Sequence, residues 1–276
     1  MTTPQFLGYP ASLVMGLALG LTGGGGSILT LPILVYLFGV GALQATAYSL
    51  GLVGLVALFG AWAAYRKGDL HLKRALSFGI PGVVGVLISR RVLLARLPET
   101  LGFGAFTLSQ SSFLLIAFSV LMLVASLSMI RSSQRDHLMS SRSVASPQTA
   151  PVSSGALIVA GLLTGLVAGF VGAGGGFLIV PALVTLGHLE MRQAVGTSLF
   201  VIALQSLLGV LGDFESLQKM DILLFVSIAI LALVGMLIGT SLRDRIEQPK
   251  LKLGFGVFVL IMGAVILLQE LRKGLI

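Results

Sequence analysis

Residues 16–32 read GLALGLTGGGGSILTLP, and residues 165–181 read GLVAGFVGAGGGFLIVP. Each stretch is apolar but contains consecutive glycines, which break a helix. Sliding the sequence by 149 positions places residues 16–50 on residues 165–199 without a gap, and 15 of the 35 pairs are identical. The matches include the glycine cluster, one proline and the pattern Gln-Ala-x-x-x-Ser in a single register, which indicate an internal duplication. The sequence therefore predicts two homologous repeats.

Composition predicts that both repeats lie in a membrane. Hydrophobic residues make up 56% of the chain and charged residues only 10%, with a mean hydropathy of +1.03. Soluble domains contain about 25% charged residues. No Asp, Glu, Lys or Arg precedes Arg66, and later charge-free stretches are also long enough to cross a bilayer. We therefore expect an all-α integral membrane protein.

The hydrophobic segments are evenly divided between the halves. They cover residues 7–38, 43–65, 75–95, 101–130, 155–187, 193–212, 222–242 and 253–270. Counting each glycine-broken segment as two pieces gives up to ten short helices. The stretch between the halves is rich in serine, contains two prolines and lacks apolar periodicity, so it reads as a linker. The expected domains are a first transmembrane repeat over 1–130, a solvated linker over 131–154 and a second transmembrane repeat over 155–276.

Loop charges indicate how the repeats are oriented. If each broken segment crosses the bilayer once, the Lys and Arg residues divide 10 to 8 between the two faces, whereas segments that turn back at the glycines divide them 12 to 6. The positive-inside rule favours the second arrangement. The equivalent loops 66–74 and 213–221 are basic and acidic respectively, as inverted repeats require, although the loops near 93 and 247 are both basic. We predict inverted-topology repeats.

The glycine breaks are the candidate substrate site. Backbone that is not helical is tolerated at bilayer depth only where it is buried in protein or lines a cavity. Helices that resume after such breaks present free N–H groups and the positive end of a dipole, which suits a small anion. The candidates are Gly23, Gly24, Gly25, Gly26 and Ser27 in one half, and Gly172, Gly174, Gly175, Gly176 and Phe177 in the other. The alternative is close helix packing, which we expect of the Gly16/Gly20 and Gly235/Gly239 pairs.

A second set of polar candidates begins the helix that follows each break. It comprises Gln44 and Ser49 in the first half and Gln193, Thr197 and Ser198 in the second. These side chains lie within about one helical turn of each other and either donate to substrate oxygens or bridge helices. The same alternatives apply to Gln205, which lies deep in its segment and has Val56 as its counterpart. Arg192 either adds positive field or anchors the helix at the interface.

Several functional classes lack the residues that they need. The chain has no cysteine, and His71, His137 and His188 lack metal-ligand spacing, so no metal or other cofactor is expected. No acid lies clearly within a membrane segment, which removes an intramembrane carboxylate relay. Neither a serine with an intramembrane histidine nor paired aspartates are present, so the protein is not expected to be an enzyme. The net charge of +8 comes from short loops and does not indicate a nucleic-acid partner.

The quoted stretches resemble the sulfite exporter TauE/SafE family, on GLTGGGGSILTLPIL in the first half and GLVAGFVGAGGGFLIVPALVTLG with RQAVGTSL in the second. The resemblance implies a multi-pass transporter of the inner membrane, linked to export or uptake of sulfite, sulfoacetate and related sulfonates. The family's motifs fall on Gly23 to Ser27, Pro32, Gly172, Gly174 to Gly176, Pro181, Ala194 and Gly196 to Ser198. The first half departs from this pattern at Thr46-Ala47-Tyr48, where Val-Gly-Thr is expected, so the motif is not strictly symmetric between the halves.

The expected partners are a small anion and the lipid bilayer. The favoured function is a secondary carrier for sulfur-containing oxyanions that works by alternating access. The alternatives are an anion channel and a carrier for a non-sulfur metabolite. A homodimer is one option for the oligomeric state.

Overall fold

The computed structural model describes residues 3–98, 100–103, 106–139, 154–172, 174–212, 221–243 and 248–274. The chain forms two compact units, each built from parts of both sequence halves. Unit 1 comprises Met1–Arg96 and Val152–Arg243, and unit 2 comprises Leu97–Pro151 and Asp244–Ile276. The predicted domain boundaries, which follow the repeats, therefore do not coincide with the compact units.

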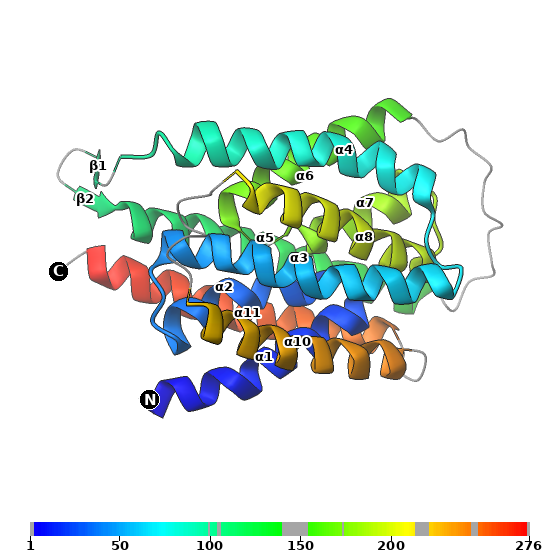
Figure 1. The fold of residues 1–276 in the computed structure, drawn as a ribbon, viewed down its shortest axis with the longest axis horizontal. Helices are drawn as coiled ribbons and strands as arrows, with labels where there is room; N and C mark the ends of the chain where they lie inside the picture. Colours follow the sequence, from blue (N-terminus) through cyan, green and yellow to red (C-terminus); the bar gives the residue numbers. More distant parts are fainter. Residues whose placement is uncertain are drawn as a thin grey trace. The chain divides into compact units, whose positions relative to one another are not determined.

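Unit 1 consists of helices and is shown with unit 2 in Figure 1. From the first half it contains α1 (Thr3–Thr22), the 3-10 helix η1 (Gly25–Leu29), α2 (Thr30–Pro32), the π-helix η2 (Ile33–Leu37), α3 (Ala42–Arg66), α4 (Leu72–Ile88) and the π-helix η3 (Ser89–Leu94). From the second half it contains α6 (Ser154–Val171), α7 (Gly176–Thr185), α8 (Met191–Val210) and α10 (Ile222–Leu242).

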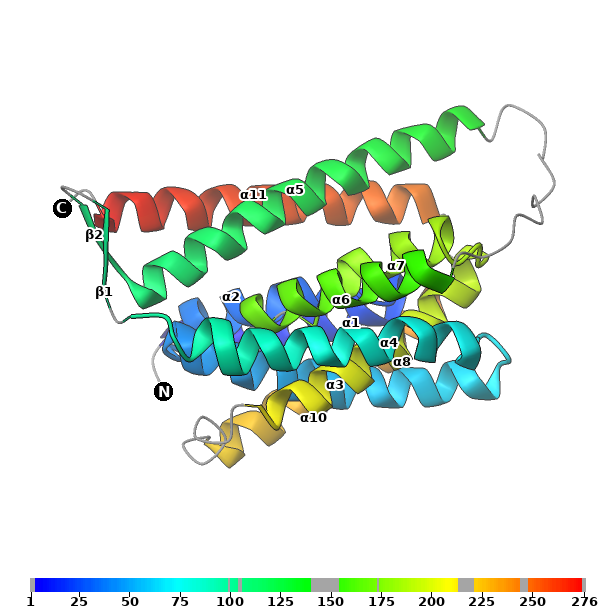
Figure 2. The same ribbon diagram turned by 90° about the horizontal axis from the view of Figure 1, so that it is seen from above.

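Unit 2 contains one long helix from each half and a short hairpin. Its elements are β1 (Thr100–Phe103), β2 (Phe106–Ser109), α5 (Gln110–Met139) and α11 (Gln248–Gly274). The two helices lie side by side in Figure 2. They run antiparallel, because Gly256 lies against Ile130 and Gly263 lies against Met122.

Seven helices among the described residues are long and apolar enough to span a bilayer. They cover Gln5–Thr22, Ala42–Arg66, Leu72–Leu94, Gln110–Arg131, Met191–Val210, Ile222–Leu242 and Leu253–Arg272. One face of α4 exposes Leu76, Ile80 and Val84, whereas Ala75 and Phe78 are buried. An exposed helix face that is itself apolar requires lipid rather than water as solvent. The predicted helical, multi-pass membrane fold is confirmed.

Both broken segments turn back on themselves. In the first, Gly26 packs against Leu19 on α1, and Gly8 packs against the ring of Phe38. The piece that follows the glycines therefore runs antiparallel to α1. In the second, Gly175 packs against Ala168 on α6, so the chain has also turned back beside α6 where α7 begins. This is the arrangement that the positive-inside rule favoured.

Small residues bring helices of the two halves into backbone contact. The parallel helices α1 and α10 meet where Gly16 lies against Ala232 and Gly20 against Met236. A side chain at Gly16 would overlap the Ala232 carbonyl oxygen, so this packing needs glycine. The parallel helices α6 and α4 repeat the arrangement, with Gly165 lying against Gly82. The two contacts pair the first segment of each half with the third segment of the other.

The central helices of the two halves, α3 and α8, are sequence counterparts and run antiparallel. Gly54 lies against Ser206, whereas Gly60, further along α3, lies against Leu199, earlier in α8. Parallel repeats would orient counterpart helices the same way, whereas inverted repeats oppose them. The packing of unit 1 is therefore consistent with the predicted repeats.

The start of the fourth segment differs from the sequence prediction. A single apolar segment over 101–130 is wrong for its first residues, because 100–103 and 106–109 form an antiparallel hairpin with Phe103 opposite Phe106. Glycine is a poor helix former, and phenylalanine and threonine favour strands, which explains the difference over TLGF and FTLS. Helix α5 also continues to Met139, into the stretch predicted as linker, and residues 140–153 lie outside the described part of the chain.

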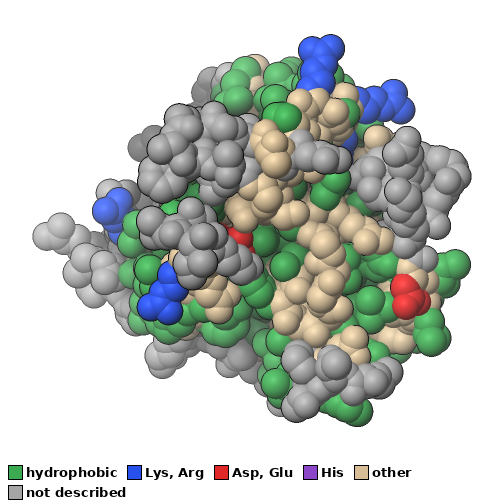
Figure 3. All heavy atoms as spheres, turned by 90° about the vertical axis from the view of Figure 1, so that its left-hand side faces the viewer, with side chains coloured by type: hydrophobic (Ala, Val, Ile, Leu, Met, Phe, Trp, Pro, Cys, Tyr) green, Lys and Arg blue, Asp and Glu red, His purple; other side chains and the backbone are tan. Residues whose placement is uncertain are grey.

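On the face drawn in Figure 3, the described charged side chains are few and lie apart among hydrophobic ones. At the end of α3, Arg66 stacks on Trp62 with 5.2 Å between the guanidinium carbon and the ring centroid. Such aromatic and cationic pairs are common where a helix leaves the bilayer.

Candidate functional site

The two glycine breaks meet inside unit 1. Gly24 lies directly against Gly176, and a Cβ atom built on either residue would lie 2.5 Å from the backbone of the other. Gly23 and Gly172 have φ angles of 73° and 74°, which side chains of L-residues rarely adopt. Part of the glycine content is therefore explained by the close contact and by the turns. This contact places the predicted glycines of both halves at one location.

The residues that face the two turns differ in polarity. A side chain at Gly23 would meet Val195, and a side chain at Gly172 would meet Thr46. Val195 and Thr46 are 149 positions apart and are thus counterparts in the repeat. The backbone arrangement is repeated, whereas the residue that directly faces the turn glycine carries a hydroxyl at the second break only.

Polar groups at the first break bind one another. The Ser198 hydroxyl lies 2.6 Å from the Gly23 carbonyl oxygen, to which it donates, and 2.8 Å from the Val195 carbonyl oxygen. The Ser27 hydroxyl donates to the Gly24 carbonyl oxygen at 2.7 Å, and the Gly25 N–H donates to Thr22 Oγ1 at 2.9 Å. Ser27 and Ser198, both predicted as substrate contacts, thus stabilise the turn in this structure.

Buried hydroxyls at the second break have no such partners. Ser49 and Ser206 are fully buried, and neither hydroxyl has a hydrogen-bond partner among the described residues. The Ser206 Oγ atom lies 3.1 Å from the position of a Cβ atom built on Gly174. Buried polar side chains without a partner are rare in native proteins, and a ligand or ordered water is the usual explanation. Ser49 was predicted from the sequence, but Ser206 was not.

A buried arginine adjoins the second break. Arg90 is 3% exposed, and its NH1 atom donates to Thr46 Oγ1 at 3.0 Å. It lies in η3, and π-helical turns occur often at functional sites. The adjacent Ser89 is fully buried, and its hydroxyl also lacks a partner among the described residues. From the sequence alone, Arg90 belongs to the basic loop near residue 93, and only its contact with Thr46 reveals its position.

Gln205 is fully buried, and neither atom of its amide group has a partner among the described residues. Its side chain packs against Gly82 of α4, close to Gly161 of α6. The neighbouring Ser206 faces α3 and Gly174 instead, so the two residues lie on different sides of α8. The unpaired amide is compatible with a polar ligand, but Gln205 does not adjoin Gly174 in the way that Ser206 does.

The remaining polar candidates lie at the helix ends. Gln44 and Gln193 are half-buried in the first turns of α3 and α8. Thr197 Oγ1 accepts the backbone N–H of His71, the residue before α4, at 3.1 Å. Its counterpart Tyr48 accepts the backbone N–H of Asp221 at the start of α10. Thr197 therefore has a structural contact in this state of the protein. The predicted contact Phe177 is buried in the first turn of α7.

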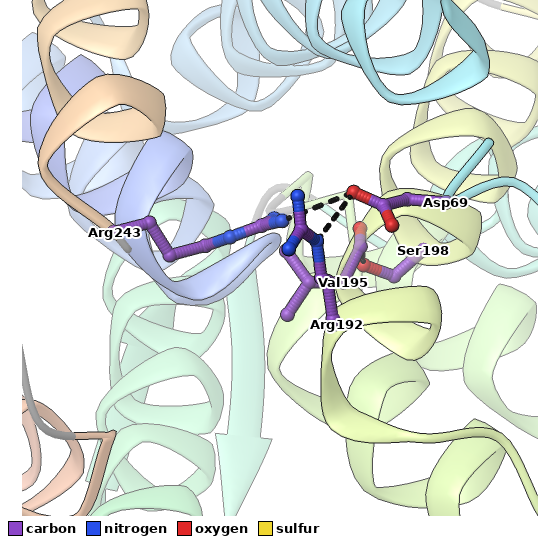
Figure 4. A network of polar contacts seen from close by, with 5 residues as sticks. All are labelled: Asp69, Arg192, Val195, Ser198 and Arg243. Carbon is purple, nitrogen blue, oxygen red and sulfur yellow. Dashed lines mark hydrogen bonds and ion pairs between the residues drawn. The ribbon is translucent and has the colours of Figure 1, made fainter. Parts of the chain in front are cut away.

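An ion-pair network holds the loop between α3 and α4. Figure 4 shows Arg192 and Arg243 pointing toward the Asp69 carboxylate. Asp69 Oδ2 lies 3.0 Å from Arg192 Nε and 3.5 Å from Arg243 NH2. Arg192 is exposed over half of its side chain, whereas Asp69 and Arg243 are buried. Because these residues are far apart in the sequence, nothing in the local pattern could have shown their association.

Metal ligands do not cluster in the part of the chain that the structure describes. No group of three or more His, Asp or Glu side chains there could hold a metal ion. The chemistry available around the two breaks is therefore hydrogen bonding by hydroxyl and backbone groups, together with the positive charge of Arg90.

Comparison with known proteins places the chain among membrane transporters. Residues 9–266 match the family model described as sulfite exporter TauE/SafE. A probable membrane transporter protein of Xylella fastidiosa is 30% identical over 263 residues, covering 90% of this chain and 88% of the relative. The probable membrane transporter protein YdhB of Bacillus subtilis is 24% identical over 249 residues, covering 89% and 92% respectively. No solved structure matches the chain significantly. The chain belongs to the sulfite exporter TauE/SafE family.

Proposed function

We propose that this membrane transporter is a secondary carrier for small anions, in particular sulfur-containing oxyanions such as sulfite or organosulfonates, in the inner membrane. The observation that carries the proposal is the meeting of the two glycine breaks at Gly24 and Gly176. Helix α7 starts at this contact, and the N-terminus of a helix favours an anion through its N–H groups and its dipole. The description of the matching family supports the sulfur oxyanion.

The residues nearest to the breaks suit a negatively charged substrate. They are apolar or carry hydroxyl groups, and Arg90 binds one of them, Thr46. None of the neighbours that contact Gly23, Gly172 or Gly174 carries a carboxylate. A cation site would need oxygen ligands with negative or strong partial negative charge, so the surroundings favour an anion.

We further propose that the halves are inverted-topology repeats that move relative to each other during transport. The antiparallel course of α3 and α8 supports the inversion. Helix α1 of the first half contacts α10 of the second, and α6 of the second half contacts α4 of the first. These reciprocal contacts support a pseudo-twofold relation between the halves. A site at the centre of such a relation can open alternately to either side.

The absence of native cysteine makes the topology directly testable. Single cysteines placed in loops 66–74 and 213–221 should react with a membrane-impermeant maleimide from opposite sides of the membrane. Reaction of both cysteines from the same side would mean that the repeats are parallel.

Transport by the purified protein in liposomes tests the function. Radiolabelled sulfite uptake should saturate, and unlabelled sulfite inside the vesicles should accelerate it, because a carrier exchanges substrate between its two conformations. Uptake that neither saturates nor responds to internal sulfite would indicate a channel. Transport of carboxylates but not of sulfur oxyanions would replace the proposed substrate class, and no anion flux above empty liposomes would contradict the proposal.

A further inference from the structure

We propose that the anion binds at the second break alone, where Ser49 and Ser206 donate to its oxygens and Arg90 supplies positive charge. This inference rests on the proposed function, because it assumes that the transported molecule is an anion. It differs from a symmetric arrangement in which both breaks provide equal halves of the site. Four observations carry it.

The first observation is that two positions with a hydroxyl beside the second break have apolar counterparts in the repeat. Thr46, which contacts Gly172, has Val195 as its counterpart at Gly23. Ser206, which adjoins Gly174, has Ala57 as its counterpart in α3. The repeat thus provides hydroxyl groups around the second break and apolar side chains at the corresponding positions of the first.

The second observation concerns the one serine that both halves share. Ser198 donates to the Gly23 carbonyl oxygen, so its hydrogen-bonding capacity is used within the protein. Its counterpart Ser49 is fully buried, and its hydroxyl has no partner among the described residues. An unpaired hydroxyl in an apolar interior is unfavourable, and a ligand that accepts its hydrogen removes this penalty.

The third observation is geometric. Thr46, Ser49 and Val53 lie three or four residues apart along α3, which places them on one face of that helix. Thr46 contacts Gly172 and Val53 contacts Gly174, so Ser49 lies between these two contacts. Ser206 approaches the same Gly174 from α8. Two unpaired hydroxyls from different helices therefore face the turn that leads into α7.

The fourth observation is the difference between the helices that resume after the breaks. Helix α7 begins at Gly176 as an α-helix and has ten residues. The helical stretch after the first break runs from Gly25 to Leu37 but begins with the 3-10 helix η1, and the Gly25 N–H already donates to Thr22 Oγ1. The N-terminus of α7 is therefore the better anion partner.

Arg90 and Thr46 complete the site in different roles. The Thr46 hydroxyl accepts from Arg90 and donates to the Leu43 carbonyl oxygen at 2.7 Å, so it has no hydrogen left for a ligand. Thr46 is thus a positioning residue that fixes the guanidinium beside the turn. Two hydroxyl donors, a helix N-terminus and a guanidinium suit a compact oxyanion with several acceptor oxygens, such as sulfite or the head group of a sulfonate.

Equilibrium binding of radiolabelled sulfite to the purified full-length protein tests the inference. Ser49→Ala and Ser206→Ala should each weaken the affinity roughly tenfold, the usual effect of losing one hydrogen bond to a charged group. Ser119→Ala is a matched control, because this buried serine of α5 donates within its own helix to Ile116, and its affinity should equal that of the wild type. Thr46→Val should also weaken sulfite binding, whereas Thr46→Ser should retain it, because serine can accept the hydrogen bond from Arg90 and valine cannot.

The possible results separate the two proposals. A wild-type protein that binds sulfite while Ser49→Ala and Ser206→Ala bind it equally well would overturn the one-sided site and leave the carrier function standing. Equal losses in Ser206→Ala and in Val195→Thr, a change at the first break, would also overturn it. A folded wild-type protein without any sulfite binding would contradict the proposed substrate and this inference with it.

Discussion

The two glycine breaks of unit 1 have the same backbone design and different surroundings. Gly23 and Gly172 share a left-handed conformation. Gly23 contacts Val195 and Gly172 contacts Thr46, and these two neighbours are counterparts in the repeat. At the first break, the Ser198 hydroxyl binds the Gly23 carbonyl oxygen. At the second break, the buried hydroxyl of Ser49 has no partner among the described residues. The comparison shows the same backbone turn in both halves with different hydrogen bonding around it.

Removing either turn glycine should have the largest effect on stability. Gly23→Ala and Gly172→Ala each force a side chain into a left-handed conformation and against the facing helix. We expect each to lower the free energy of unfolding by about 3 kcal/mol or more. Fluorescence-detected size exclusion and thermal unfolding in detergent measure the loss.

Gly39→Ala is the matched control for this pair. Gly39 has a φ of 71°, but no atom lies within 4 Å of a Cβ atom built there. Only backbone strain is then expected, which costs about 1 kcal/mol. Wild-type stability in Gly23→Ala or Gly172→Ala would show that glycine is not equally required at the two turns. That result would contradict the shared backbone design of the two breaks.

The ion-pair network should have an intermediate effect. Asp69→Asn removes the carboxylate that binds Arg192 and the buried Arg243. Because Arg192 is largely exposed to solvent, we expect a loss of about 2 kcal/mol, below the 3–5 kcal/mol typical of a fully buried pair. The exposed Glu190→Gln, close to Arg192 in the sequence, should change the melting temperature little. A stable Asp69→Asn protein would mean that the network does not hold the loop that packs on α8.

The smallest expected difference distinguishes the paired serines. Ser198→Ala loses the hydrogen bond to Gly23 and should cost about 1 kcal/mol in protein without ligand, whereas Ser49→Ala removes an unpaired hydroxyl and should cost nearly nothing. Thermal unfolding in a buffer without oxyanions compares them. A greater loss for Ser49→Ala would show that its hydroxyl has a structural partner and would reverse the assignment of the two breaks.

Much of the fold could be predicted from the sequence because its signals are local. Long charge-free stretches indicated the membrane helices, and the consecutive glycines together with the loop charges indicated that the first segment of each half turns back. The strand pair 100–103 and 106–109 was missed, because its aromatic residues resemble a membrane segment in hydropathy although Gly102 disfavours a helix.

The site could be predicted only in part. The glycines and Ser49 belong to the repeated motif, so comparing the halves was sufficient to find them. Arg90 and Ser206 become visible only through contacts with Thr46 and Gly174, which depend on tertiary packing. The sequence nevertheless contained a signal of this asymmetry. The repeat aligns Thr46 with Val195 and Ser206 with Ala57, so each of these positions is polar in one half and apolar in the other.

The most direct test of the central claim is the thermal stability of the purified protein with sulfite, sulfate, sulfoacetate, taurine, carboxylates or chloride. A ligand at about 100 times its dissociation constant should stabilise the folded state by about 2.7 kcal/mol. We predict selective stabilisation of the wild-type protein by one sulfur oxyanion, reduced to about 1.4 kcal/mol in Ser206→Ala at the same ligand concentration and retained in Ser119→Ala. Stabilisation by no anion, or equal stabilisation of Ser206→Ala and the wild type, would contradict an anion site at the second break.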